Sequence, residues 1–146
     1  MDKRINIQNI DDEAYKAMFA LENYLTNSSL SVSLKELIKI RASQINGCAY
    51  CIDMHTAEAF KNGESQRRIF AVSAWWESPL FDKNEKMALK MTDEVTLIAK
   101  NGLSTETYQN AAEIFNEKEL AEIIMQIVTI NAWNRIAVST RLFHEK

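Results

Sequence analysis

The chain has 146 residues, of which 47% are hydrophobic and 25% charged, and its formal net charge is −3 at pH 7. This length and composition predict one domain, residues 1–146, with a full hydrophobic core. The negative charge and the lack of a basic run argue against nucleic acid as a partner. No apolar stretch approaches the roughly 20 residues of a membrane span. The N-terminal segment lacks the apolar core of a signal peptide, so we expect a cytoplasmic protein without a membrane partner.

Helical periodicity extends through most of the chain. Apolar residues recur three and four positions apart, and no run shows the period-two alternation of a strand. We therefore predict an all-α fold, a bundle of about six to seven helices. The expected helices run from Asp11 or Asp12 to Leu25, from Ser33 to Asn46, from Cys48 to Asn62, from Ser65 to Ala74, from Asp82 to Asn101, from Ser104 or Thr105 to Phe115, and from Asn116 toward Leu142.

Glycines and capping patterns set several of these expected ends. Each of the three glycines, Gly47 among them, follows a helical pattern, as residues just past a helix C-terminus do. Two segments begin with the spacing of a capping box, Ser33-x-x-Glu36 and Asp82-x-x-Glu85. In such a box the two side chains bond each other's backbone N–H groups, which favours a helix start at both places.

The segment from Cys48 to His55 holds both cysteines of the chain. In a helix, Cys48 and Cys51 are three residues apart and Cys51 and His55 are four, so all three side chains share one face. A CxxC pair that opens a helix is typical of a redox site, because the helix N-terminus stabilises a thiolate and the second thiol is near enough to form a disulfide. In a cytoplasmic protein this spacing favours a catalytic or metal-binding role over a structural disulfide.

The preceding helix contributes a carboxylate to this segment. Gly47 directly precedes Cys48, so the two helices are expected to pack as an antiparallel hairpin. At a rise of about 1.5 Å per residue, Glu36 lies about 15 Å and His55 about 10 Å from the turn, a difference of about one helical turn. The two side chains can span that difference. The predicted order along the hairpin is Cys48, Cys51, His55, Glu36.

These residue types suit the reduction of a peroxide. A thiolate attacks the peroxide, a histidine accepts the thiol proton, and a carboxylate orients the imidazole. The sulfenic acid that results condenses with the second thiol to a disulfide, which an external reductant reopens. The helix N-terminus favours a thiolate at Cys48, whereas His55 favours proton removal from Cys51. We prefer Cys51 as the attacking thiol and Cys48 as the resolving one.

Other interpretations of the same residues remain open from the sequence. The cysteines can be small buried apolar residues. Cys48, Cys51 and His55 can instead be three ligands of a zinc ion, although one helix rarely completes a tetrahedral site. Glu36 can cap its own helix with Ser33 rather than serve the histidine, and the two roles compete for one carboxylate.

Several polar and aromatic residues lie outside this motif. Tyr50 and Trp133 can line a pocket for an apolar peroxide or can belong to the core. Asn131 and Asn134 are polar residues in an apolar helix and need hydrogen-bond partners if they are buried. His144 lies in the C-terminal tail, where we expect it to be exposed.

The pattern Glu36-x11-Cys48-x-x-Cys51-x3-His55 resembles the core motif of the AhpD-like alkylhydroperoxidases, within the carboxymuconolactone decarboxylase superfamily. The stretch LKELIKIRASQINGCAYCIDMHTAEA is similar to that family's signature over its whole length. SAWWESPLF, DEVT and INAWNR are similar to its downstream landmarks. The resemblance extends over roughly residues 20–143.

This resemblance implies an all-helical homo-oligomer that reduces organic hydroperoxides with a thiol or dithiol reductant, and with no bound cofactor or metal. It assigns catalytic positions to Glu36, Cys48, Cys51 and His55, and makes the cysteine nearer the histidine the peroxidatic one. AhpD itself is longer, with two related helical halves, and has a histidine where this chain has Tyr50. A chain with one core domain is expected to replace the missing half by association, as a dimer or a trimer of dimers.

Two other functions have to be distinguished from a thiol peroxidase. One is a helical oligomer of the same family whose CxxC pair senses redox state or binds a partner without significant turnover. The other is an enzyme like a lactone decarboxylase, for which the cysteines are dispensable because the decarboxylase branch lacks the pair. Peroxide consumption that needs both cysteines separates the peroxidase from both.

Overall fold

The computed structural model describes residues 4–143, and this part of the chain is helical and contains no strand. The all-α prediction is confirmed. His144 lies outside the described residues. The helices are α1 (Ile7–Ile10), α2 (Asp12–Thr26), α3 (Val32–Asn46), α4 (Ala49–Lys61), α5 (Gln66–Ala71), α6 (Lys83–Thr96), α7 (Thr105–Ala112) and α8 (Glu117–Thr140), with a 3₁₀ turn, η1 (Val72–Ala74), after α5.

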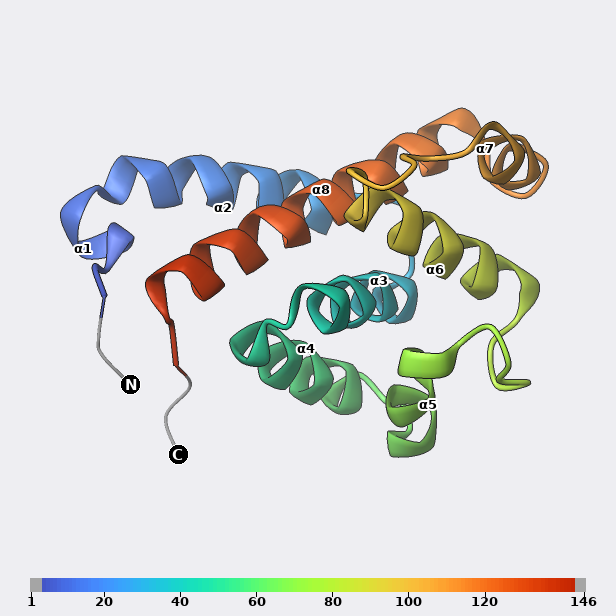
Figure 1. Ribbon diagram of the computed structural model, residues 1–146, viewed down its shortest axis with the longest axis horizontal. Helices are drawn as coiled ribbons and strands as arrows, with labels where there is room; N and C mark the ends of the chain where they lie inside the picture. The colour runs from blue at the N-terminus through green and yellow to red at the C-terminus, as the bar shows by residue number, and fades with distance from the viewer. Residues whose placement is uncertain (1–3, 144–146) are drawn as a thin grey trace.

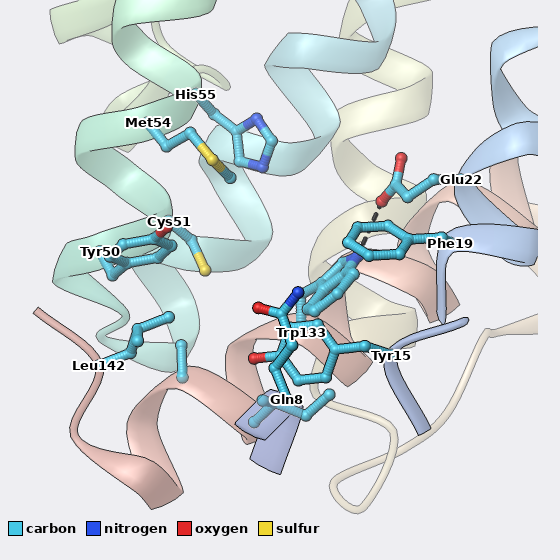
Figure 2. A pocket seen from close by; sticks show the side chains of 12 residues that line it. Gln8, Tyr15, Phe19, Glu22, Tyr50, Cys51, Met54, His55, Trp133 and Leu142 are labelled. Carbon is cyan, nitrogen blue, oxygen red and sulfur yellow. Dashed lines mark hydrogen bonds between the residues drawn. The ribbon is translucent and has the colours of Figure 1, made fainter. Parts of the chain in front are cut away.

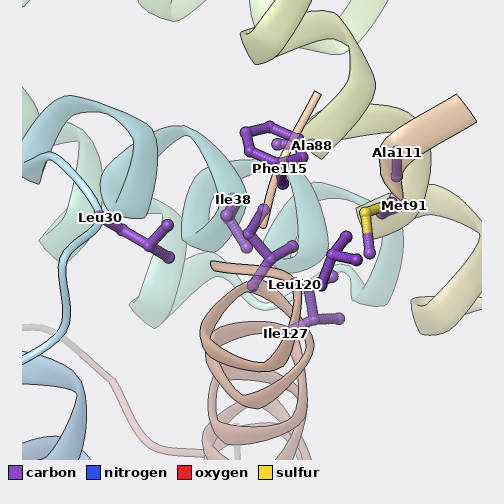
Figure 3. Packing of buried hydrophobic residues seen from close by; sticks show 9 residues of the cluster. Leu30, Ile38, Ala88, Met91, Ala111, Phe115, Leu120 and Ile127 are labelled. Atoms are coloured by element: carbon purple, nitrogen blue, oxygen red, sulfur yellow. The ribbon is translucent and has the colours of Figure 1, made fainter. Parts of the chain in front are cut away.

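Helix α3 lies at the centre of the fold, between α4, α6 and α8 (Figure 1). Its apolar residues face two sides of the helix. Ile38 belongs to a core shared with α6, α7 and α8, where Met91, Leu120 and Ile127 also lie (Figure 3). Leu37 and other residues on the opposite side belong to a second core with α4, α5 and α6. Because α3 is buried on both sides, its neighbour α4 is held in a fixed position next to it.

The helix ends follow the predicted capping patterns in several places. Asp82 accepts a hydrogen bond from the backbone of Glu85, and the Glu85 side chain accepts one from the Asp82 backbone, so the predicted capping box of α6 is confirmed. Asn116 starts α8 with a second box of this kind. Helix α6 ends at Thr96 rather than at the predicted Asn101. Residues 97–101 form turns instead.

The N-terminal arm, residues 4–26, includes a short helix that the sequence did not predict. Asn6 caps α1 by accepting a hydrogen bond from the backbone of Asn9. Helix α2 then lies along α8 (Figure 1). Leu25 is the one residue of α2 that is buried. The arm is therefore attached to the body of the protein mainly through the surface of α8. No helix in residues 4–143 is long and apolar enough to cross a membrane.

Candidate active site

The turn between α3 and α4 positions the cysteines. Gly47 ends α3 with φ +64°, a left-handed conformation that glycine adopts without strain. Cys48 is then the N-cap of α4, and Cys51 lies in the first turn of that helix. Both sulfurs are therefore near the positive end of the helix dipole, which favours a thiolate. The predicted hairpin is confirmed, since α3 and α4 pack against each other.

Glu36 and His55 meet across this hairpin, as the depth estimate predicts. His55 Nδ1 lies 3.0 Å from Oε2 of Glu36, and Lys39 Nζ lies 2.9 Å from the other carboxylate oxygen. Burial raises the pKa of the Glu36 carboxyl, but the hydrogen bonds and charges of His55 and Lys39 outweigh it and hold the pKa below its usual value. An ionised Glu36 accepts the hydrogen bond, so the proton of the imidazole lies on Nδ1. The second nitrogen, Nε2, is then free to act as a base.

The expected capping box of α3 is wrong. The cap is Ser31, whose hydroxyl accepts a hydrogen bond from the backbone of Leu34. Ser33 instead lies inside the first turn and donates to Glu64. The Glu36 carboxylate is therefore not used as a cap and is committed to His55 and Lys39.

The two cysteines are free thiols in contact with each other. Their sulfurs are 2.8 Å apart, and the residues are 1% and 2% exposed. The hydrogen bond between the two sulfurs lowers the pKa of Cys48 to about 6, although burial opposes the change. The same hydrogen bond, together with burial, raises the pKa of Cys51. Above about pH 6 the pair therefore carries one negative charge and shares one proton between two sulfurs.

A network of amide side chains supports the cysteine pair from α3 and α8. Asn134 donates to the Ser43 hydroxyl at 3.0 Å and accepts from Asn46 at 2.9 Å. Asn131 accepts a second hydrogen bond from Asn46. Hydrogen bonds from Asn134 to the sulfurs also favour the thiolate at both cysteines. At Cys51 this contribution is smaller than the hydrogen bond and burial that raise its pKa. The predicted need of these two asparagines for partners is confirmed.

A cavity of about 340 Å³ opens beside the cysteines. Cys51 and His55 line it (Figure 2), whereas Cys48 and Glu36 are not among the residues of its wall. The wall is mainly apolar and aromatic. Tyr50 and Trp133 both line this cavity, as one of the two sequence interpretations predicted. A substrate in the cavity therefore reaches Cys51 rather than Cys48.

The far wall of the cavity comes from α2, and the sequence analysis missed it. Tyr15, Phe19 and Glu22 line the cavity from this helix. The rings of Tyr15 and Phe19 lie 5.4 Å and 5.9 Å from the ring of Trp133, whose indole N–H donates to Glu22 at 2.8 Å. The three α2 residues follow the spacing i, i+4, i+7 of one helical face, which was the available signal. Met18, Leu21 and Leu25 form an apolar stripe beside this face and are the stronger signal in the sequence.

The alternative interpretation of Cys48, Cys51 and His55 as zinc ligands finds no support among residues 4–143. No group of three or more His, Cys, Asp or Glu side chains in this range is arranged to hold a metal ion. The nearest polar neighbours of the sulfurs are instead hydrogen-bonding amides and hydroxyls. These groups stabilise a thiolate, which suits thiol chemistry.

Comparison with known proteins identifies one family and two relatives that are similar over nearly the whole chain. A model of the carboxymuconolactone decarboxylase family matches residues 12–94. The uncharacterized protein YdfG of Bacillus subtilis (strain 168) is 40% identical over 139 residues, which cover 95% of each chain. The crystal structure of a protein of unknown function from Agrobacterium tumefaciens, described as a proposed antioxidant defence protein AhpD, superimposes with a TM-score of 0.96 at 41% identity and covers 99% of each chain.

The same fold occurs in a more distant enzyme. The debrominase Bmp8, in a crystal structure with 2,3,4-tribromopyrrole, superimposes with a TM-score of 0.85 at 18% identity over 94% of this chain and 74% of that one. Similarity at this level concerns the fold alone, and the fold is compatible with more than one reaction. The chemistry has to be argued from the side chains of the site.

Proposed function

Because the chain belongs to the carboxymuconolactone decarboxylase family, we propose that it is a thiol-dependent peroxidase that reduces organic hydroperoxides. One observation carries the proposal. Cys51 lies in the wall of the cavity, its sulfur is 2.8 Å from that of Cys48, and it shares the wall with His55, which Glu36 holds by a 3.0 Å hydrogen bond. An attacking sulfur and a base thus line one cavity, and a resolving thiol is in contact with the attacking one. The relative described as a proposed antioxidant defence protein supports this reading.

The first step consumes the peroxide. At rest the pair carries its one negative charge mainly on Cys48 and its one remaining proton on Cys51. His55 Nε2 accepts that proton, and the Cys51 thiolate that results attacks the terminal peroxide oxygen. The O–O bond breaks, two electrons pass from sulfur to the peroxide, and the alkoxide takes the proton from His55 and leaves as an alcohol. Cys51 is left as a sulfenic acid. Glu36 stabilises the imidazolium while the proton is on the ring.

The second step forms a disulfide between the two cysteines. The Cys48 thiolate attacks the sulfur of the Cys51 sulfenic acid, the S–O bond breaks, and the hydroxide leaves as water with a proton that reaches it from solvent. The sulfurs move from 2.8 Å to the roughly 2.05 Å of a disulfide. An external dithiol then supplies two electrons and two protons by thiol–disulfide exchange. Such donors are abundant in the reducing cytoplasm, where we propose that the enzyme works.

We also propose that the chain works as a homo-oligomer, a dimer or a trimer of dimers. Large apolar side chains remain exposed on α4, on α5 and after η1: Phe60 is 58% exposed, Phe70 74% and Trp76 52%. Exposed apolar residues of this size favour burial against another copy. Light scattering after size-exclusion chromatography measures the mass, and a monomer at micromolar concentration contradicts the proposal.

The peroxidase proposal is tested by measuring organic hydroperoxide consumption with dithiothreitol, together with a probe that traps sulfenic acid. The wild type is expected to turn over, and both Cys51→Ser and Cys48→Ser are expected to fail. After one addition of peroxide, Cys48→Ser traps a sulfenic acid and Cys51→Ser does not. Equal activity in all three proteins excludes the thiol mechanism and favours a lactone-directed enzyme. A disulfide that forms without repeated turnover favours a redox sensor.

A further inference from the structure

A second cavity adjoins the one beside Cys51. It has a volume of about 410 Å³, and Tyr15 and Leu142 line both cavities. Two arginines from opposite ends of the chain, Arg4 and Arg141, line the second cavity. The two cavities together form a site with an apolar, aromatic half next to the thiol and a cationic half further away.

Arg4 is held in place within this site. Its Nη1 donates to the backbone carbonyl of Ser139 at 2.7 Å, which ties the N-terminal arm to the end of α8. Among the described residues, the lining of the second cavity contains no Asp or Glu side chain. Arg4 and Arg141 are therefore the only charged side chains among the described residues of this wall.

The charge on the opposite side of the site has the other sign. Glu22 lines the first cavity, accepts from Trp133 Nε1 at 2.8 Å and lies across that cavity from Leu142 (Figure 2). No Lys or Arg is among the described residues that line the first cavity. An anionic group is therefore repelled at the Glu22 side and attracted at the arginine side, which orients an elongated molecule in one direction.

We infer that the preferred substrate is the hydroperoxide of a long-chain carboxylic acid, with its carboxylate on Arg4 and Arg141. Guanidinium groups bind carboxylates through charge-assisted hydrogen bonds. The acyl chain passes Tyr15 and Leu142 and lies against the aromatic wall, which brings a hydroperoxyl group within the chain to Cys51. This substrate class rests on the proposed peroxidase function, and the binding of the acid itself does not.

The test compares linoleic acid hydroperoxide with its methyl ester, which has the same chain and no charge. The wild type is expected to use the acid with a kcat/KM about tenfold above that of the ester. Arg4→Gln and Arg141→Gln are each expected to lower this acid-to-ester ratio several-fold. The control Arg67→Gln removes the same charge from an exposed position on α5 and is expected to keep the ratio. Equal use of acid and ester by the wild type, or the same ratio in all variants, overturns the inference.

Two further measurements separate this inference from the peroxidase proposal. If the wild type consumes neither tert-butyl hydroperoxide nor linoleic acid hydroperoxide, the peroxidase proposal fails. Calorimetric titration with linoleate, which carries no peroxide, still tests the acid site: binding weakened by Arg141→Gln but not by Arg67→Gln supports it, and no binding overturns it.

Vesicles of peroxidised anionic phospholipid test the other source of an anionic acyl chain. Turnover of vesicles without turnover of the free acid contradicts the inference.

Discussion

His55 Nδ1 lies 3.0 Å from Oε2 of Glu36, although the two residues are on different helices and 19 positions apart. Both residues are buried, at 9% and 6% exposure. Lys39 bonds the second oxygen of the same carboxylate, so the charge of Glu36 is balanced on one side by a lysine and is available to the imidazole on the other. His55 lines the cavity together with Cys51, whereas Glu36 is not among the residues of the cavity wall.

Replacing Glu36 with Gln is expected to lower kcat/KM for an organic hydroperoxide by about tenfold to hundredfold. The amide oxygen keeps the hydrogen bond from Nδ1 but has no charge to stabilise the imidazolium. Steady-state kinetics with dithiothreitol measures the effect. The matched control is Glu58→Gln, an exposed glutamate on α4, which is expected to behave as wild type. A Glu36→Gln enzyme with full activity shows that the carboxylate has no part in the proton transfer.

The cysteine pair is expected to lose its first proton near pH 6, because the Cys51 thiol lowers the pKa of Cys48 to about 6. Below that pH both sulfurs are protonated and the initial rate of peroxide reduction falls. Above it the pair carries one negative charge and the rate reaches a plateau. An ordinary thiol ionises only near pH 8.5 or so. The ultraviolet absorbance of the thiolate, followed against pH, measures the midpoint.

The variant Cys51→Ala removes the thiol that is hydrogen-bonded to Cys48. The midpoint of thiolate absorbance is expected to rise toward that of an ordinary cysteine, although the helix N-terminus and Asn134 still favour the charged form. The titration is independent of turnover, so it applies to an inactive protein. An unchanged midpoint in Cys51→Ala argues against a shared proton.

Asn134→Ala is expected to lower the free energy of unfolding by about 1–3 kcal/mol. The substitution leaves Ser43 without its donor and Asn46 without one of its acceptors, in a region where Asn134 is 1% exposed. Urea denaturation measures the loss. The control Asn23→Ala changes the same residue type on the exposed face of α2 and is expected to stay within about 0.5 kcal/mol of wild type. If both variants lose the same free energy of unfolding, the Asn134 hydrogen bonds stabilise the fold no more than an exposed asparagine does.

Trp133→Phe is expected to loosen α2 while it keeps an aromatic ring in the cavity wall. The substitution removes the N–H that donates to Glu22 at 2.8 Å, and α2 has only Leu25 as a buried anchor. The amides of α2 are expected to exchange with solvent about tenfold faster, with those of α3 unchanged. Hydrogen exchange followed by mass spectrometry reports both helices. Trp76→Phe, at a 52% exposed tryptophan, serves as the control, and equal exchange in the two variants contradicts this role.

Local features of the site were predictable because they depend on residues close together in the chain. Gly47 and the CxxC spacing place Cys48 and Cys51 at the start of a helix, and helical periodicity places His55 on the same face. The short turn between α3 and α4 even predicts the depth at which Glu36 meets His55, since both helices are measured from one point. The capping box of α6 follows from the same kind of local pattern.

Local pattern failed where two partners compete for one group. Ser31 and Ser33 both suit the start of α3, and the Ser33-x-x-Glu36 spacing favours the second. In the structure Ser31 is the cap, and the Glu36 carboxylate bonds His55 and Lys39. A buried imidazole and an ammonium group are stronger partners for a carboxylate than a backbone N–H at an exposed helix end.

The sequence by itself determined the all-α class, the family and the thiol–imidazole–carboxylate set, because these depend on periodicity and on spacing within one hairpin. Only the tertiary structure decided which cysteine faces the cavity, that α2 supplies its aromatic wall, and that Arg4 and Arg141 share a second cavity. These relations join segments more than a hundred residues apart. They depend on how α2 and α8 pack side by side, and helical spacing within one segment carries no information about that packing.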